Sequence, residues 1–99
     1  MRIVDRSVFG DRQEPNTAHE RAVSLVDGDR QAAYGAPADN LARIGQAWGA
    51  VLGLPEPISA FRTALMMSVL KAVRAAHRGD EDSCVDLLGY GELAARLRP

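Results

Sequence analysis

Apolar residues recur every three or four positions along most of this chain, which is the spacing of amphipathic helices. The longest such stretch covers residues 59–78. Its apolar positions are Phe61, Leu65, Val69, Ala72 and Ala76, and Met66, Leu70 and Val73 widen the same face. A helix with so broad an apolar face needs neighbours to cover it, so we expect this helix to lie at the centre of the protein.

Three further helices are predicted from similar spacing, over about residues 17–28, 38–52 and 80–97. Thr17 followed by Glu20 is typical of a helix start, and Gly28 is typical of a helix end. Within the second of these helices the apolar positions are Leu41, Ile44, Trp48, Val51 and Leu52. A glycine and two prolines between positions 53 and 57 then end that helix.

Residues 1–16 mix apolar and charged positions with only weak alternation, so we interpret them as an N-terminal arm. The remaining residues, 17–99, contain no internal repeat and are connected by short segments, which is typical of antiparallel helical neighbours. The sequence therefore predicts an all-α fold: a compact four-helix bundle formed by a single helical domain, preceded by the arm.

The last predicted helix carries two glycines in its interior, Gly89 and Gly91. Each costs about 1 kcal/mol of helix stability relative to alanine. We expect the close approach of another backbone, or of a ligand, to compensate for this cost. Cys84 lies on the apolar side of the same helix, where we expect it to be a small buried residue.

Composition narrows the possible partners and the compartment. The chain has 12 basic and 13 acidic residues, and its basic side chains do not gather on one polar helix face, so DNA binding is disfavoured. Cys84 is the single cysteine, which excludes an intrachain disulfide and a cysteine zinc site. The longest apolar run, residues 64–70, is too short to span a membrane, and the first residues lack a signal-peptide pattern. We expect a cytoplasmic protein with no membrane partner.

A chain of 99 residues buries a limited share of its surface, about 60–65%, so it is marginally stable as a monomer. Apolar residues also occur on more than one side of the last helix. Together these features predict a homo-oligomer or a complex with another protein.

The strongest candidate site is formed by charges on the last two helices. Lys71 and Arg74 share one face of the third helix, and Asp82 and Asp86 share one face of the fourth. If the helices fold back on one another at Gly79, Arg74 comes opposite both aspartates, and Lys71 comes opposite Asp86 and Tyr90. The two carboxylates could hold Mg²⁺ while the cations bind phosphate. The alternative is a structural set of ion pairs, which the nearby cations favour because they weaken metal binding.

The connection between Asp29 and Pro37 is the longest between predicted helices, and loops often carry function. Arg30 could bind a phosphate and Tyr34 could stack on a base. Equally, Arg30 could fix the loop to the bundle and Tyr34 could fill the core.

The order of several motifs resembles a family of small phage and prophage proteins classified as a domain of unknown function. The motifs are Gly28-Asp29-Arg30, Tyr34-Gly35 with Pro37 and Asn40, Trp48, Lys71 with Arg74, and Asp82-Ser83 with Asp86-Leu87-Leu88-Gly89-Tyr90. Such a resemblance implies a phage or prophage gene, but it implies no particular activity.

The segment that begins at Asp86 also resembles, more distantly, the all-α nucleotide pyrophosphohydrolases of the MazG type. In that family a glutamate three residues earlier helps to bind magnesium, whereas this chain has Ser83 there and lacks the paired-glutamate motif on the preceding helix. We therefore expect nucleotide or phosphorylated-ligand binding by Arg30, Tyr34, Lys71 and Arg74. Mg²⁺-dependent hydrolysis through Asp82 and Asp86 is less favoured. The competing hypothesis is a non-enzymatic accessory module that binds a host or phage protein.

Overall fold

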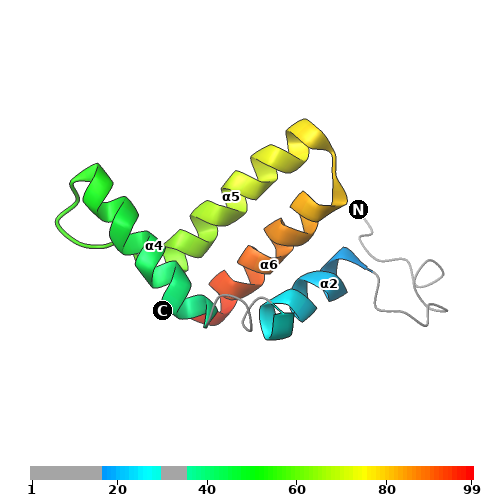
Figure 1. The fold of residues 1–99 in the computed structure, drawn as a ribbon, viewed down its shortest axis with the longest axis horizontal. Helices are drawn as coiled ribbons and strands as arrows, with labels where there is room; N and C mark the ends of the chain where they lie inside the picture. The colour runs from blue at the N-terminus through cyan, green and yellow to red at the C-terminus, as the bar shows by residue number, and fades with distance from the viewer. Residues whose placement is uncertain (1–16, 30–35) are drawn as a thin grey trace.

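The computed structural model describes residues 17–29 and 36–99, and this part of the chain is all-α without strands. Figure 1 shows α5 and α6 as an antiparallel pair, with α2 alongside α6 and α4 crossing the beginning of α5. The helices are α2 (Ala18–Ser24), α4 (Pro37–Leu52), α5 (Ala60–Arg78) and α6 (Glu81–Leu97), and a π-helical segment, η1 (Leu25–Asp29), continues α2. The predicted all-α bundle is confirmed, and residues 1–16, predicted to form an arm, lie outside the described residues.

Local signals place the helix ends as predicted. The Thr17 hydroxyl oxygen accepts a hydrogen bond from the Glu20 backbone N–H at 3.0 Å, which caps α2. Gly53 and Gly79 end α4 and α5 with φ angles of 68° and 66°, a left-handed conformation that favours glycine. The expected end of the first helix at Gly28 falls inside η1, because the α-helical pattern stops at Ser24 and continues as π-helix.

The core is formed where η1, α4, α5 and α6 meet. Its buried apolar residues are Val26, Leu41, Ala64, Leu93 and Ala94. Phe61 and Tyr90 are partly buried against this cluster. Leu41 brings α4 into the core and is only 1% exposed. The core is thus assembled from small and medium-sized side chains.

The predicted burial of the apolar face of α5 is wrong for most of its length. α5 does lie between α4 and α6, but Val69 and Val73 are each 64% exposed and Leu65 is 44% exposed. The buried residues of this helix are instead Thr63 and Ala64. Hydrophobic spacing identifies the apolar face of a helix, but it does not identify the molecule that covers it. Here α6 packs against the opposite, alanine-containing side.

The end of α4 departs from the prediction in the same way. Leu41 is buried as expected, and Ile44 and Trp48 are partly buried. Val51 is 84% exposed and Leu52 is 64% exposed, because α4 crosses α5 and extends beyond it (Figure 1). The last turn of α4 therefore has no neighbouring helix in the described part of the chain.

Gly45 and Gly49 of α4 have no side chains, so the chain can pass close to α4 after the break at residues 53–57. The Ile58 N–H donates to the Gly45 carbonyl at 3.2 Å. A Cβ added at Gly45 would lie 2.0 Å from the Ile58 carbonyl oxygen and 2.8 Å from Thr63 Oγ1. Thr63 itself is fully buried and donates from its hydroxyl to the Ser59 carbonyl at 2.8 Å. This contact fixes α4 to the start of α5.

The glycines of α6 differ from each other. A Cβ on Gly89 would meet Val26 Cγ2 at 3.8 Å and the Ala22 carbonyl oxygen at 4.0 Å, so α2 does approach this position closely. Gly91 is exposed, and a Cβ there would meet nothing within 4 Å. Cys84 is also exposed, which corrects the prediction that it is buried. Its neighbours Val85 and Asp86 face α2 and α5, so Cys84 points away from both at 100° per residue.

Gly91→Ala is expected to stabilise the protein by roughly 1 kcal/mol, because alanine removes the helix cost of glycine and the new methyl group contacts nothing. The measurement is the free energy of unfolding in urea. A loss of stability would show that Gly91 is in contact with a neighbour after all.

Candidate ligand-binding cleft between α2 and α6

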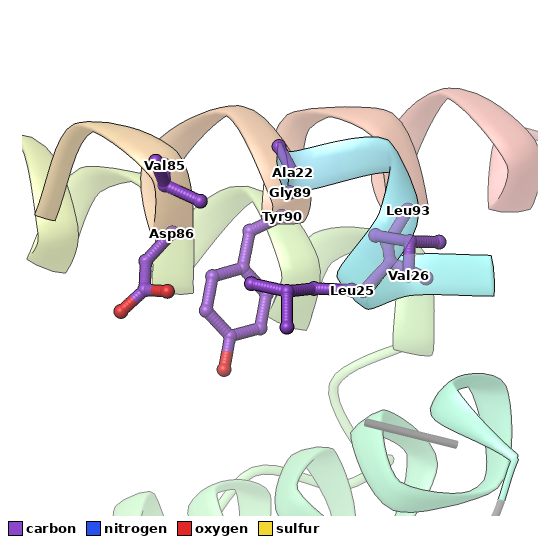
Figure 2. A pocket seen from close by; sticks show the side chains of 8 residues that line it. All are labelled: Ala22, Leu25, Val26, Val85, Asp86, Gly89, Tyr90 and Leu93. Atoms are coloured by element: carbon purple, nitrogen blue, oxygen red, sulfur yellow. The ribbon is translucent and has the colours of Figure 1, made fainter. Parts of the chain in front are cut away.

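A small cleft separates α2 and η1 from α6, and its cavity volume is about 20 Å³. Its lining residues are Ala22, Leu25, Val26, Val85, Asp86, Gly89, Tyr90 and Leu93 (Figure 2). All but Asp86 and the Tyr90 hydroxyl are apolar. This volume is far below the roughly 300–1,000 Å³ of most ligand pockets and suffices for about one water molecule. A nucleotide-sized molecule would therefore enter only if α2 and η1 moved away from α6.

The spacing of residues along α6 creates the cleft. Val85, Gly89 and Leu93 are four positions apart and form one side of the helix, which faces α2. Because Gly89 has no side chain and Ala22 has a small one, α2 and α6 lie close together without filling the space beside Tyr90. Figure 2 shows the Asp86 carboxylate and the Tyr90 ring projecting to the same side of α6, at the edge of this space.

Lys71 and Asp86 form the ion pair that borders the cleft. The distance from Lys71 Nζ to Asp86 Oδ2 is 3.0 Å, and the two side chains are only 18% and 23% exposed. The expectation that Lys71 faces Asp86 is therefore confirmed. Because both charges are largely removed from water, their attraction is screened less than that of a surface pair.

Asp82 has a different partner from the predicted one. Arg21 of α2 lies 3.2 Å from Asp82 Oδ1 and 3.1 Å from Glu81 Oε1. Arg74 is exposed, and the described ion pairs of Asp82 and Asp86 are those with Arg21 and Lys71. The Asp82 side chain is 84% exposed, so it lies on the outer surface rather than in the cleft. Sequence reasoning missed Arg21 because the packing of α2 on α6 is a long-range contact with no local signal.

The two aspartates predicted to hold magnesium are thus bound to different cations. Within residues 17–29 and 36–99, no three histidine, cysteine or acidic side chains are grouped closely enough to hold a metal ion. The magnesium site stays a prediction, and Asp82 and Asp86 would each have to share a cation with the metal. Arg30 and Tyr34, the other predicted ligand-binding residues, lie outside the described residues.

A further ion pair joins η1 to α6, at the end of the cleft away from Arg21. Arg96, near the end of α6, lies 2.7 Å from Asp27 of η1. This hydrogen bond raises the pKa of the Arg96 guanidinium above its ordinary value. The pairs formed by Arg21 and Arg96 therefore hold α2 and η1 against α6 at both ends of the cleft.

Asp80 prepares the start of α6 without entering the cleft. Its Oδ2 atom accepts hydrogen bonds from the Ser83 backbone N–H and from the Ser83 hydroxyl, both at 3.0 Å. These bonds lower the pKa of the Asp80 carboxyl below its usual value, because they stabilise its charged form. Asp80 is therefore a helix cap rather than a group that gives up or takes up a proton near neutral pH.

The wall opposite α6 includes an unusual backbone segment. Leu25 and Val26, which line the cleft, belong to the π-helical η1. Single π-helical turns are rare and occur frequently at functional sites. This feature, together with the cleft and the ion pair, makes the α2–α6 junction the best candidate for a binding site in the described part of the chain.

The described helices and this cleft define a small all-α protein whose candidate site lies between a short helix and the C-terminal helix. Residues 17–98 match a protein family described as "Domain of unknown function (DUF6378)". The match covers most of the chain, so the chain belongs to this family. No curated protein and no solved structure matches it. No helix among the described residues is long and apolar enough to cross a membrane.

Proposed function

We propose that the α2–α6 cleft binds a nucleotide or another phosphorylated small molecule. The observation that supports this proposal most directly is the partly buried Lys71–Asp86 pair at the edge of an otherwise apolar cleft. An apolar wall suits a planar base, and a partly buried cation beside it suits a phosphate.

Each part of the cleft has a defined role in this proposal. The Tyr90 ring and the Leu25 and Val26 side chains would contact the base, since aromatic and aliphatic groups accept a planar ring without requiring a particular sequence of polar atoms. The Lys71 ammonium has three donors, so it can hold Asp86 and still donate to a phosphate oxygen. The cleft is too small to enclose a base while α2 lies against α6. The base would enter as α2 moves away, and the phosphates would lie over the edge of the cleft.

Arg74 and the predicted residues Arg30 and Tyr34 complete the proposal. Arg74 is one turn beyond Lys71 on α5 and is exposed. Arg30 and Tyr34 follow η1 directly in the sequence, and η1 forms one wall of the cleft. A phosphate chain that extends beyond the cleft could therefore be bound by additional cations.

Binding without hydrolysis is the form of this proposal that the contacts favour. Hydrolysis would need Mg²⁺ at Asp82 and Asp86, and these carboxylates are paired with Arg21 and Lys71. A distant relation to the MazG-type pyrophosphohydrolases and a phage or prophage origin belong to the same proposal. The first rests on the segment that begins at Asp86 alone, and the second rests on the order of the motifs alone.

The test is thermal unfolding of the protein with nucleoside mono-, di- and triphosphates, each with and without Mg²⁺. A ligand at about one hundred times its dissociation constant adds roughly 2.7 kcal/mol to the stability of the folded state. For a domain of this size we expect a rise in Tm of roughly 10–20 °C. Release of pyrophosphate in the same mixtures reports any turnover.

Lys71→Met supplies the matched variant, and Arg43→Met, which removes an exposed cation from α4, is its control. We expect Lys71→Met to weaken ligand binding by roughly tenfold or more, because it removes a charge-assisted hydrogen bond to phosphate. Arg43→Met should bind as tightly as the natural chain. Equal affinity in all three proteins, or no Tm shift with any nucleotide, would contradict the proposal.

A further inference from the structure

The contacts that attach α2 to α6 are individually weak. Among the described residues of α2, only Ala22 is buried, and a methyl group exposes little apolar surface when it leaves a contact. α2 is also attached through Arg21, which pairs with Glu81 and Asp82 of α6. The side chains of these two acidic residues are more than half exposed, and exposed pairs contribute little to stability. α2 can therefore leave α6 without disrupting much of the protein.

η1, which continues α2, is attached more firmly. Val26 is buried and belongs to the core cluster together with Leu93 of α6. Asp27 also accepts a hydrogen bond from Arg96 at 2.7 Å. Figure 2 shows Val26 and Leu93 at one end of the cleft and Val85 at the other. Val85 is buried but lies outside the core cluster, so the core supports only the η1 end of the cleft.

The junction between α2 and η1 is suited to bending. The α-helical pattern of hydrogen bonds ends at Ser24, and the π-helical turn begins at Leu25. π-helical turns interrupt the regular α-helical hydrogen bonds, and kinks in helices commonly occur at them. The bend therefore falls between the weakly attached α2 and the part of η1 that packs in the core.

The position of α2 closes the cleft. A Cβ added at Gly89 would lie 4.0 Å from the Ala22 carbonyl oxygen, so the backbone of α2 lies directly on α6. The cavity that remains holds about one water molecule. A planar base can reach the Tyr90 ring and the Lys71 ammonium together only after α2 has moved.

We propose that α2 is a lid over the cleft, that η1 is its hinge, and that Arg21 is the latch that holds the lid closed. The inference rests on the proposed function and adds how a ligand enters the cleft. Opening breaks the contacts of Arg21 and Ala22 and uncovers Val85, whereas Val26 stays packed against Leu93. The cleft therefore opens at the end nearest the start of α6. Arg21 does not line the cleft, so it controls access rather than contacting the ligand.

The first test measures opening without any ligand. In a Cys84→Ser background, Val85→Cys places a thiol at the latch end of the cleft and Leu93→Cys places one at the hinge end, where the native side chains are 2% and 6% exposed. A maleimide reacts with a buried thiol only when local or global opening exposes it. We expect Val85→Cys to react roughly tenfold faster than Leu93→Cys, each rate being divided by that of the same variant unfolded in urea.

Equal rates for the two thiols would mean that only unfolding of the whole domain exposes them, and they would overturn the proposal. Leu93→Cys alters the core, so it lowers global stability more than Val85→Cys does. This difference raises the rate at the hinge end. It can therefore narrow the expected contrast between the two thiols but cannot create it.

Arg21→Gln tests the latch. It removes the charge that pairs with α6, so the Val85→Cys thiol should react about threefold faster, which is the effect of losing one exposed ion pair. The reaction of Leu93→Cys should not change. Arg43→Gln, which removes an exposed charge from α4, is the control and should leave both rates unchanged. If Arg21→Gln also left both rates unchanged, Arg21 would not be the latch.

The second test fixes one end of the lid at a time. In one variant, Arg21→Cys and Asp82→Cys are joined across the latch by a short bis-maleimide. In the other, Asp27→Cys and Arg96→Cys are joined across the hinge, and both variants carry Cys84→Ser. All four native side chains are at least 38% exposed, so these substitutions should leave the fold intact.

We expect the latch cross-link to abolish the rise in Tm that nucleoside triphosphates produce, and the hinge cross-link to preserve it. Each variant before cross-linking is its own control and should bind the nucleotides. An undiminished rise in Tm with the latch cross-linked would overturn the proposal, because the ligand would then enter without movement of α2.

The two tests distinguish the lid from the proposed function. Thiol labelling needs no nucleotide, so faster reaction of Val85→Cys than of Leu93→Cys supports the lid even if no nucleotide binds. In that case the natural chain would show no rise in Tm, and the proposed function alone would be wrong. If nucleotides bind but the two thiols react equally slowly, the proposed function stands and the lid is wrong.

Discussion

Gly45→Ala is expected to loosen the attachment of α4 and to lower the free energy of unfolding by about 1–3 kcal/mol, the range for overpacked sites. The added methyl group would lie 2.0 Å from the Ile58 carbonyl oxygen and 2.8 Å from Thr63 Oγ1. The contacting atom of Ile58 belongs to the backbone, so rotation of a side chain cannot relieve the clash and the backbone must move. The shift would also lengthen the 3.2 Å hydrogen bond from Ile58 N–H to the Gly45 carbonyl.

Urea unfolding measures the loss of stability, and hydrogen exchange at the Ile58 amide locates it. Gly91→Ala is the matched control, because it makes the same glycine-to-alanine change within a helix where the methyl group meets nothing. The two variants should change stability in opposite directions. If Gly45→Ala were neutral or stabilising, α4 would not pack against the residues before α5 as described.

Asp86→Ala should destabilise the fold by about 1–3 kcal/mol, because it leaves the Lys71 ammonium without this carboxylate in a position that is only 18% exposed. Asp82→Ala is the comparison: the Asp82 side chain is 84% exposed, and its pair with Arg21 should contribute less than about 1 kcal/mol. Chemical denaturation of both variants at one pH and ionic strength gives the two losses directly.

A second substitution separates the two possible causes of that loss. Lys71→Met in the Asp86→Ala protein removes the unpaired charge, so it should recover part of the stability. If Asp86→Ala and Asp82→Ala lowered the free energy of unfolding by the same amount, the partial burial of the Lys71–Asp86 pair would contribute nothing to stability. If Lys71→Met brought no recovery, the loss would come from the other contacts of Asp86.

Much of the fold could be predicted because its signals are local. Thr17 with Glu20 marks the beginning of α2, and Gly53 and Gly79 mark the ends of α4 and α5, because each acts on a backbone within a few residues. The Lys71–Asp86 pair was also predictable, since a turn at Gly79 and the periodicity of two helices determine which residues face each other.

The parts that could not be predicted depend on long-range packing. Nothing near Arg21 in the sequence shows that α2 lies beside the start of α6, so its pairing with Asp82 was missed and Arg74 was assigned instead. The cleft was missed for the same reason, although Gly89 gave a partial signal because a neighbour was expected there. The exposed side of α5 formed by Leu65, Val69 and Val73 was assigned to the core because periodicity identifies an apolar side of a helix but not what packs against it.

The way in which α2 is held to α6 determines how the cleft can open. α2 has only seven residues, and exposed ion pairs fasten α2 and η1 to α6: the Arg21 side chain is 38% exposed and the Arg96 side chain is 45% exposed. Exposed pairs contribute at most about 1 kcal/mol each and weaken further in salt. Separation of α2 from α6 therefore requires less free energy than unfolding of the α5–α6 pair. The residence time of a molecule enclosed in the cleft would then be set by the opening rate of this short helix, and it would shorten as ionic strength rises.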